Sequence, residues 1–336
     1  MELIDTSFHH IDHANSKTIE INVTDKDGQL KEYVSQLLEL IIAKSSGKRS
    51  FSFQSDTSEV KLALDLMLND NFEKGKSING ERLLRVEKAT QDKYSHITEI
   101  QKGILFQAHF KTEDRIVIVI SKADHSEFLD ESDLQLRRGL PWKKKVFKAA
   151  AVYFDLEGIV DEVFVLDTNT NISRYWWESY LGLREKYTDS HNTKTALDIL
   201  DRKVFDKIKI EFPADHTILR NSAVGYFRSQ KVFDIGHFAN SLLSDYHPID
   251  PALDPQILKE KVLVLPEKWK FDKKFSVVKK EIRKKMINRI PLTDSIELLL
   301  TDHISDLAGI IKAEKDEEGT KYIKIRTDEG YRRFSE

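Results

Sequence analysis

Three short clusters in the first third of the sequence combine residue types that could do chemistry. His9-His10-x-x-His13 places two imidazoles on one face of a strand, where they could bind a metal ion. Asp56 with Glu59-x-Lys61 has the residue types of a restriction-type nuclease site. Gly75-Lys76-Ser77 resembles the end of a phosphate-binding loop. Each cluster needs a particular element to position it.

The elements expected around these clusters argue against each chemistry. The apolar spacing after Asp56 predicts a helix that Asp56 and Glu59 cap, whereas such a nuclease site needs its acid and lysine on a strand edge. Asp70 stands where a phosphate-binding loop has its first glycine. At least one of the three histidines is expected inside the sheet, and no further ligand can be assigned to them. We therefore expect no catalytic residues, no metal site and no cofactor.

The strongest signal is a concentration of positive charge in Lys268–Arg289, which we call the basic stretch. It contains ten lysines and arginines against two acids, in a chain whose net charge is −3. Cationic side chains bind phosphates, and the interleaved rings of Trp269, Phe271 and Phe275 could stack on bases. The alternative is a solvated surface element whose aromatic rings face the core. The predicted DNA contacts in the basic stretch are Lys268, Lys270, Lys273, Lys274, Lys279, Lys280, Arg283, Lys284, Lys285 and Arg289.

A second basic cluster follows the acidic segment Asp124–Asp133. Residues 137–148 hold six lysines and arginines and no acid. Such segregation of charge favours two anion-facing surfaces, although Gly139-Leu-Pro141 also marks an ordinary turn. The predicted DNA contacts in this cluster are Arg137, Arg138, Lys143, Lys144 and Lys145.

Composition limits the class of protein. The chain has 336 residues, of which 40% are hydrophobic, so it is long enough for two domains with buried cores. A pI near 6.4 excludes a protein that is positive over its whole surface, so anion binding must be local. Cysteine is absent, which excludes disulfides and thiolate nucleophiles. No signal-peptide pattern and no long apolar run occur, so we expect a cytoplasmic protein without a membrane span.

The order of secondary-structure signals predicts an α/β protein of the α+β kind. We expect a mixed-sheet N-terminal domain with flanking helices, a helical middle and a small strand-rich C-terminal part. The clearest hairpin joins Gly103–Phe110 to Arg115–Ser121, whose apolar run Ile116–Ile120 is typical of a central strand covered on both faces. The proline-rich segment His247–Pro255 is the best linker candidate. The expected parts are residues 1–168, the helical residues 169–248 and the basic, strand-containing residues 249–336.

One segment of the basic stretch suggests a family. Lys270-Phe-Asp-Lys-Lys-Phe275, followed by a basic segment and Ser295–Leu300, resembles the C-terminal region of bacterial nucleoid-associated proteins of the NdpA/YejK type. The order of features over most of the chain is similar, from an early strand with a histidine to a strand-rich end containing Gly319–Ile325. The linker candidate and the acidic segment depart from this pattern, which indicates a divergent member, such as one carried by a defence cassette.

The resemblance implies association with the bacterial nucleoid and binding of double-stranded DNA, without a known catalytic set. Only Lys270, Lys273 and Lys274 match its motif. We expect mostly non-sequence-specific phosphate contacts, because no helix-turn-helix, zinc finger or other docking module is recognisable. Two alternatives stay open: a nuclease-like DNA-processing effector or defence-system protein, and an adaptor that binds an acidic protein.

A homodimer or larger assembly is also expected. The helical middle is rich in large apolar side chains, more than one small helical layer readily buries alone. These side chains are Trp176, Trp177, Tyr180, Leu183, Tyr226, Phe227, Phe233 and Phe238.

Overall fold

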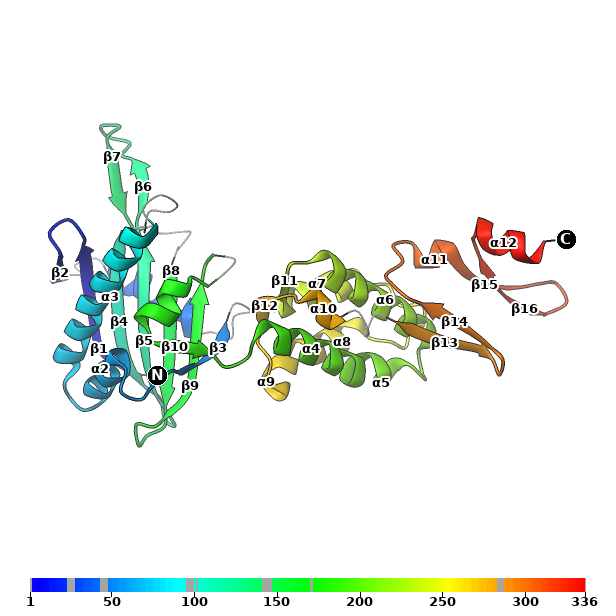
Figure 1. Ribbon diagram of the computed structural model, residues 1–336, viewed down its shortest axis with the longest axis horizontal. Helices are drawn as coiled ribbons and strands as arrows, with labels where there is room; N and C mark the ends of the chain where they lie inside the picture. Colours follow the sequence, from blue (N-terminus) through cyan, green and yellow to red (C-terminus); the bar gives the residue numbers. More distant parts are fainter. Residues whose placement is uncertain are drawn as a thin grey trace. The chain divides into compact units, whose positions relative to one another are not determined.

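The chain forms two compact units, Met1–Tyr187 (unit 1) and Thr188–Glu336 (unit 2). The structure is a computed structural model that describes residues 2–22, 28–42, 48–94, 100, 102–140, 147–169, 172–282 and 287–335. An antiparallel sheet with helices is followed by a helical region and then by small hairpins (Figure 1). The predicted α+β class is therefore confirmed. The described strand pairs of the main sheet are all antiparallel, where we expected a mixed sheet.

Unit 1 is built on an eight-stranded sheet with the order β10-β3-β9-β8-β5-β4-β1-β2. Its strands are β1 Glu2–Asp12, β2 Lys17–Glu20, β3 Arg49–Phe53, β4 Gly103–Lys111, β5 Ile116–Asp124, β8 Phe147–Phe154, β9 Val160–Asp167 and β10 Leu183–Glu185. The predicted hairpin is confirmed, since β4 pairs with β5 along its whole length. A separate hairpin consists of β6 Ser126–Leu129 and β7 Leu136–Gly139.

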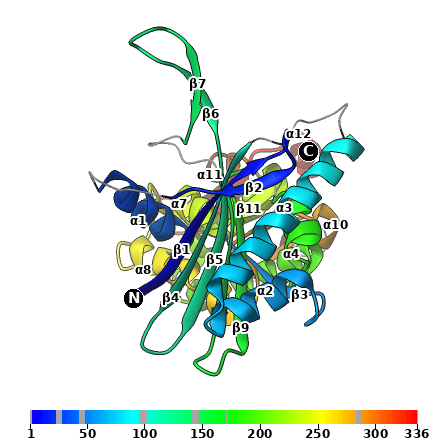
Figure 2. The ribbon, with the colours of Figure 1, turned by 90° about the vertical axis from the view of Figure 1, so that its left-hand side faces the viewer.

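Helices cover both faces of this sheet. They are α1 Gln29–Ile42, α2 Glu59–Leu68, α3 Phe72–Tyr94 and the π-helical turn η1 Tyr175–Tyr180. Ile118 and Ile120 of β5 belong to a core with α2, α3 and η1, whereas Val117 and Val119 belong to a core with α1. Figure 2 shows α1 and the α2–α3 pair on opposite sides of the sheet. Successive residues of a strand point to opposite faces, so a strand covered on both faces is apolar throughout, as predicted for Ile116–Ile120.

Unit 2 begins with helices around one core. They are α4 Asp189–Leu200, the π-helical turn η2 Asp201–Phe205, α5 Asp206–Ile208, α6 Pro213–Ser229, α7 Ile235–Leu243, α8 Pro255–Leu263, α9 Leu265–Trp269 and α10 Lys279–Ile282. A short two-stranded sheet, β11 Val232–Asp234 with β12 Lys274–Ser276, brings the basic stretch onto this core. The carboxylate of Asp234 accepts the backbone N–H groups of Gly236 and His237, so Asp234 caps α7 as its position before the helix indicates.

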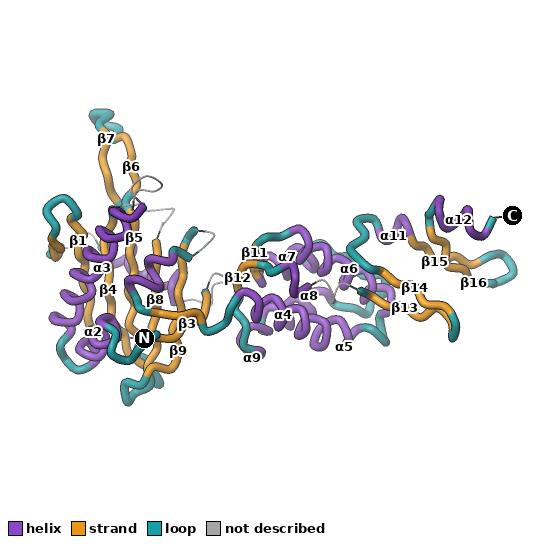
Figure 3. The backbone as a smooth tube through the Cα atoms, in the orientation of Figure 1, coloured by secondary structure: helices purple, strands orange, loops and turns teal. Residues whose placement is uncertain are grey.

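Two small hairpins and two short helices complete unit 2 (Figure 3). They are β13 Asn288–Thr293 with β14 Ile296–Leu300, α11 Leu307–Ile310, β15 Ile311–Lys315 with β16 Lys321–Ile325, and α12 Asp328–Phe334. The β15–β16 hairpin turns at Asp316–Gly319. Neither strand of the β15–β16 hairpin and no residue of α12 is buried.

The core clusters correct several expectations. Trp176, Tyr180 and Leu183 are buried in unit 1 rather than in the helical middle. The proline-rich segment His247–Pro255 lies inside unit 2, where Asp215 accepts two of its backbone N–H groups, so it is not a linker between the units. The division at residues 168 and 248 stays a prediction.

The side chains that suggested a homodimer pack within the chain. All eight except Trp177 are buried in the two units. They pack as core within each unit because helices and strands distant in the sequence contribute to the same core clusters. These side chains therefore do not support the predicted homodimer or larger assembly, which would need a different surface.

Candidate nucleic-acid interface

The basic stretch is neither one helix nor one strand. Its described residues include the end of α9, then β12, α10 and the start of β13. This path turns Phe271 and Phe275 into the core of unit 2, where they are 3% and 2% exposed. Rings at that exposure cannot stack on bases, so this part of the prediction is wrong. Trp269, in contrast, is 38% exposed.

Two predicted contact residues form ion pairs on the surface of unit 2. Lys273 Nζ lies 3.1 Å from a carboxylate oxygen of Glu267, and Arg289 Nη1 lies 3.3 Å from Glu297. The Arg289 pair is mostly exposed and therefore weak, so an incoming phosphate can compete with it, whereas the Lys273 side chain is only 15% exposed. These two residues therefore carry less free positive charge than the sequence implies.

Lys279 has a structural role. Its Nζ donates hydrogen bonds to the carbonyl oxygens of Phe227, Arg228 and Gln230 at 2.8, 2.6 and 2.8 Å. These carbonyls end α6, where backbone acceptors lack helical partners. Burial, together with the Arg228 charge, lowers the pKa of Lys279. A phosphate contact would compete with this cap, so the assignment of Lys279 as a DNA contact stays a prediction that the cap does not favour.

An exposed group on unit 2 retains the features that the basic stretch predicts. We call Lys203, Lys268, Trp269 and Lys270 the α9 corner; all four are exposed. The Lys203 amine lies 4.5 Å from the centroid of the Trp269 ring. Lys270 ends α9 in a left-handed conformation with φ of 57°, and its carbonyl lies 3.2 Å from the His191 ring. Sequence reasoning missed Lys203, because it lies on η2, far from the basic stretch in the chain.

The remaining predicted contacts of the basic stretch divide into three groups. Lys280 is exposed on α10. Lys274 is half-buried in β12. Arg283, Lys284 and Lys285 lie outside the described residues.

The second basic cluster is largely neutralised where the structure describes it. Arg137 on β7 lies 2.8 Å from Asp130 and 2.9 Å from Asp133, two acids of the preceding segment. Lys148 is buried on β8, with its amine 2.9 Å from Asp124. Lys143, Lys144 and Lys145 and the side chain of Arg138 lie outside the described residues. For Arg137, the acidic segment and the basic cluster that are separate in the sequence are thus brought together by the β6–β7 hairpin.

The early histidines do not share a face of one strand. β1 ends at Asp12; His9 is buried in it, whereas His13 follows it and approaches Glu87 with Nε2 2.9 Å from Oε2. Burial lowers the pKa of His9, although the Glu20 charge opposes this. The described residues hold no group of three or more metal-ligating His, Asp or Glu side chains.

The nuclease-like residues hold α2 in place. Ser58, not Asp56, caps α2, since its Oγ accepts the Lys61 N–H. Glu59 binds Arg82 and Arg85 of α3; burial raises the pKa of Glu59, but the two arginines outweigh this and lower it. Lys61 pairs with Asp65. The acid and the lysine therefore point to separate structural partners.

Gly75-Lys76-Ser77 lies inside α3 and is a packing motif. A Cβ atom on Gly75 would lie 2.4 Å from Met67 Cγ and 2.5 Å from the Ala63 carbonyl oxygen, so glycine permits α2 and α3 to cross closely. Lys76 is buried and lies 2.6 Å from Glu20 and 2.7 Å from Glu73. Burial lowers its pKa, but the bonds to the two acids outweigh this and raise it. These residues thus form no phosphate-binding loop.

A buried ionic network in unit 1 was not apparent from the sequence. Lys122 of β5 contacts Glu87 of α3 at 2.6 Å and Asp124 at 3.5 Å, and Asp124 in turn contacts Lys148. The Tyr175 hydroxyl lies 3.4 Å from Glu87. These side chains come from four elements, so no local pattern marks them. With side-chain exposures of 0 to 8% for the four charged groups, the network ties α3 to the sheet.

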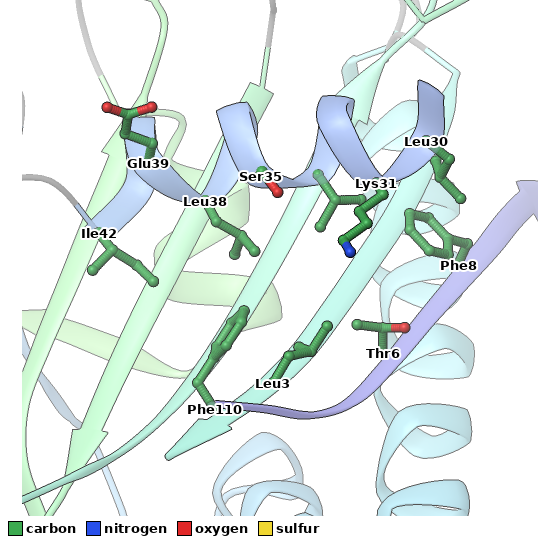
Figure 4. A pocket seen from close by; sticks show the side chains of 11 residues that line it. Leu3, Thr6, Phe8, Leu30, Lys31, Ser35, Leu38, Glu39, Ile42 and Phe110 are labelled. Atoms are coloured by element: carbon green, nitrogen blue, oxygen red, sulfur yellow. The ribbon is translucent and has the colours of Figure 1, made fainter. Parts of the chain in front are cut away.

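An apolar groove of about 630 Å³ lies beside α1 (Figure 4). Leu3 and Phe8 of β1 and Phe110 of β4 face Leu38 and Ile42 of the helix across it. Its lining suits an apolar group rather than a phosphate. The groove therefore differs in chemical character from the α9 corner, which is positively charged.

Comparison with known proteins identifies no relative of this chain. No protein-family model matches the chain, and no curated protein matches it. No helix among the described residues is long and apolar enough to cross a membrane. The resemblance to nucleoid-associated proteins therefore stays a prediction.

Proposed function

We propose that the protein binds DNA through the α9 corner of unit 2, mainly by phosphate contacts. The observation that carries this proposal is an exposed Trp269 with three exposed lysines around it: Lys268 and Lys270 beside it in the chain and Lys203 over its ring. Lysines supply sequence-independent affinity for the phosphate backbone. An exposed aromatic ring adds a surface for stacking where bases are unpaired.

The proposed DNA-binding surface includes fewer cationic residues than the basic stretch contains. Lys279 is used as a helix cap, and Lys273 and Arg289 have acidic neighbours. Lys280 adds one more exposed charge to the three lysines of the α9 corner. These four lysines neutralise about four phosphates, which predicts a slope of log affinity against log salt of about −3.6 on duplex DNA. The resemblance to nucleoid-associated proteins points to the same ligand and to the nucleoid as its place.

The test is a salt titration of binding to a labelled duplex, followed by fluorescence anisotropy. Changing Lys203, Lys268 and Lys270 to Glu should flatten the slope by about three units and weaken binding equally for unrelated sequences. The matched control changes Lys312, Lys315 and Lys321, three exposed lysines of the β15–β16 hairpin, to Glu. An unchanged slope in the first variant, with circular dichroism showing it folded, refutes the proposal. Equal flattening in both variants shows that only net charge matters.

Two further assays address the other classes of function. Incubation with supercoiled plasmid and Mg²⁺ or Mn²⁺ tests the nuclease-like alternative, and we expect the plasmid to stay intact. Competition with polyglutamate tests the adaptor alternative. We expect DNA to remain bound, because the α9 corner offers an exposed aromatic ring beside its lysines. Bases can stack on that ring, whereas polyglutamate has no group that does so.

A further inference from the structure

A polar pocket of about 430 Å³ lies in unit 2, and its lining includes none of the residues that define the α9 corner. Residues of η2, α5, α6 and β13 line it, so it forms only when the strand that begins at the end of the basic stretch packs on the helices. Its lining includes Lys209, Arg220 and Arg289, which are cationic, and Asp201 and Asp206, which are anionic. A volume of this size is within the range of small-molecule sites.

Two polar side chains of this pocket are positioned to donate to a ligand. His216 lines the pocket and is only 5% exposed. The Nδ2 atom of Asn288 is buried and has no acceptor among the described residues. A buried donor without an acceptor costs about 1–3 kcal/mol. A ligand that brings acceptor oxygens into the pocket would remove this cost.

The charges around these donors favour an anion. Asp201 is engaged by Arg220, with nitrogen–oxygen distances of 3.1 and 3.3 Å, which leaves Lys209 and Arg289 facing one further acid, Asp206. Arg289 also contacts Glu297, but both side chains of that pair are mostly exposed, so the contact is weak. Burial, then the charges of Lys209 and Arg220, lower the pKa of His216 to about 4, and Asp206 opposes them only in part.

We infer that this pocket binds a phosphate group, with Lys209 and Arg289 supplying charge and His216 and Asn288 supplying hydrogen-bond donors. The group is a phosphate monoester or free phosphate, because a dianion uses both cations and offers several acceptor oxygens. Its source is either the phosphorylated end of a DNA strand or a free mononucleotide. The inference does not rest on the α9 corner.

Isothermal titration calorimetry of the full chain tests the site with three probes: inorganic phosphate, adenosine monophosphate and a short duplex with or without a 5′ phosphate. Lys209→Met and Arg289→Met should each weaken phosphate binding about tenfold, as the loss of one charge-assisted contact predicts. Lys207→Met is the matched control; this lysine is exposed on α5, two residues from Lys209, and does not line the pocket. It should leave binding unchanged.

The His216 ring provides a second readout that folding effects do not imitate. Phosphate should raise its pKa, measured by NMR, because a dianion favours the imidazolium form. Tighter binding of adenosine monophosphate supports the nucleotide source, and dependence on the 5′ phosphate of the duplex supports the DNA end. The inference is overturned if none of the probes binds at about 10 mM, or if binding leaves the His216 pKa unchanged and persists in both methionine variants. Salt-dependent duplex binding by the α9 corner is measured separately, so either proposal can fail alone.

Discussion

The Nζ atom of Lys122 lies 2.6 Å from Oε1 of Glu87, and neither side chain has exposed surface. The pair joins the central strand β5 to helix α3. Glu87 also accepts from His13, so its two carboxylate oxygens are both used. Burial raises the pKa of Glu87, but the Lys122 charge and the bonds outweigh this and lower it.

Removing one member of this pair should destabilise unit 1. Glu87→Gln removes the charge that lies closest to the buried Lys122 amine, and we expect the free energy of unfolding to fall by about 3–5 kcal/mol in urea titrations. The double variant Glu87→Leu, Lys122→Met should lose less than the sum of the single variants. Glu73→Gln is the control, because that side chain is 79% exposed and its pair with Lys76 is shared with Glu20. A loss for Glu87→Gln no larger than for the control would contradict a tightly coupled buried pair.

His216 should make stability depend on pH. Its pKa in the folded chain is about 4, against an ordinary value of 6.5, so the unfolded chain binds the extra proton between these values. Stability is therefore complete above pH 6.5 and falls as pH is lowered toward 4, by about 3 kcal/mol from this group. His216→Gln should flatten the pH profile of unfolding in this window. An identical profile for the variant would show that other groups, such as His9 and His109, cause the dependence.

Two glycines of α3 should respond oppositely to the same change. Gly75→Ala forces the new methyl group against Met67 and a backbone oxygen, and we expect a loss of about 1–3 kcal/mol. Gly80→Ala meets only Thr18 at 3.5 Å, an ordinary contact, and should gain up to about 1 kcal/mol through helix propensity. Thermal unfolding of both variants measures the difference. Stabilisation by Gly75→Ala would show that α2 and α3 do not cross as closely as described.

Adjacent lysines on α10 should also differ. Lys279→Met removes three donors from the end of α6 and should cost about 1–3 kcal/mol. Lys280→Met changes an exposed side chain and should stay within about 0.5 kcal/mol. Urea unfolding compares the two. Equal effects would mean that Lys279 does not cap the helix in solution.

The C-terminal hairpin is the remaining basis for a homodimer. Ile323 and Ile325 are two residues apart on β16, so they share a face, and they are 48% and 42% exposed. An isolated two-stranded hairpin is marginally stable in water, so a second copy that covers this face would stabilise both. We expect a dimer mass by light scattering that Ile323→Lys with Ile325→Lys converts to a monomer mass. Tyr322→Lys, on the opposite face, should keep the dimer. A wild-type monomer mass at all concentrations would exclude this interface.

Local pattern by itself determined much of this fold. The apolar run in Ile116–Ile120 indicated a strand covered on both faces, and an aspartate directly before a helix, such as Asp234 before α7, is typical of a helix cap. Both signals depend on residues close together in the chain, where strand alternation and helix capping act. The charge in Lys268–Arg289 likewise identified a region worth testing for anion binding.

Only the tertiary structure decided which of those charges have partners in the protein. Lys279 and Lys280 are adjacent and both exposed, yet of the two it is the Lys279 amine that binds the carbonyls ending α6, because the end of that distant helix lies beside it. Lys203 joins Trp269, and Glu87 joins Lys122, across long stretches of chain. Partners of charged side chains are set by long-range packing, where burial makes an unpaired charge costly, and the order of residues does not record that packing.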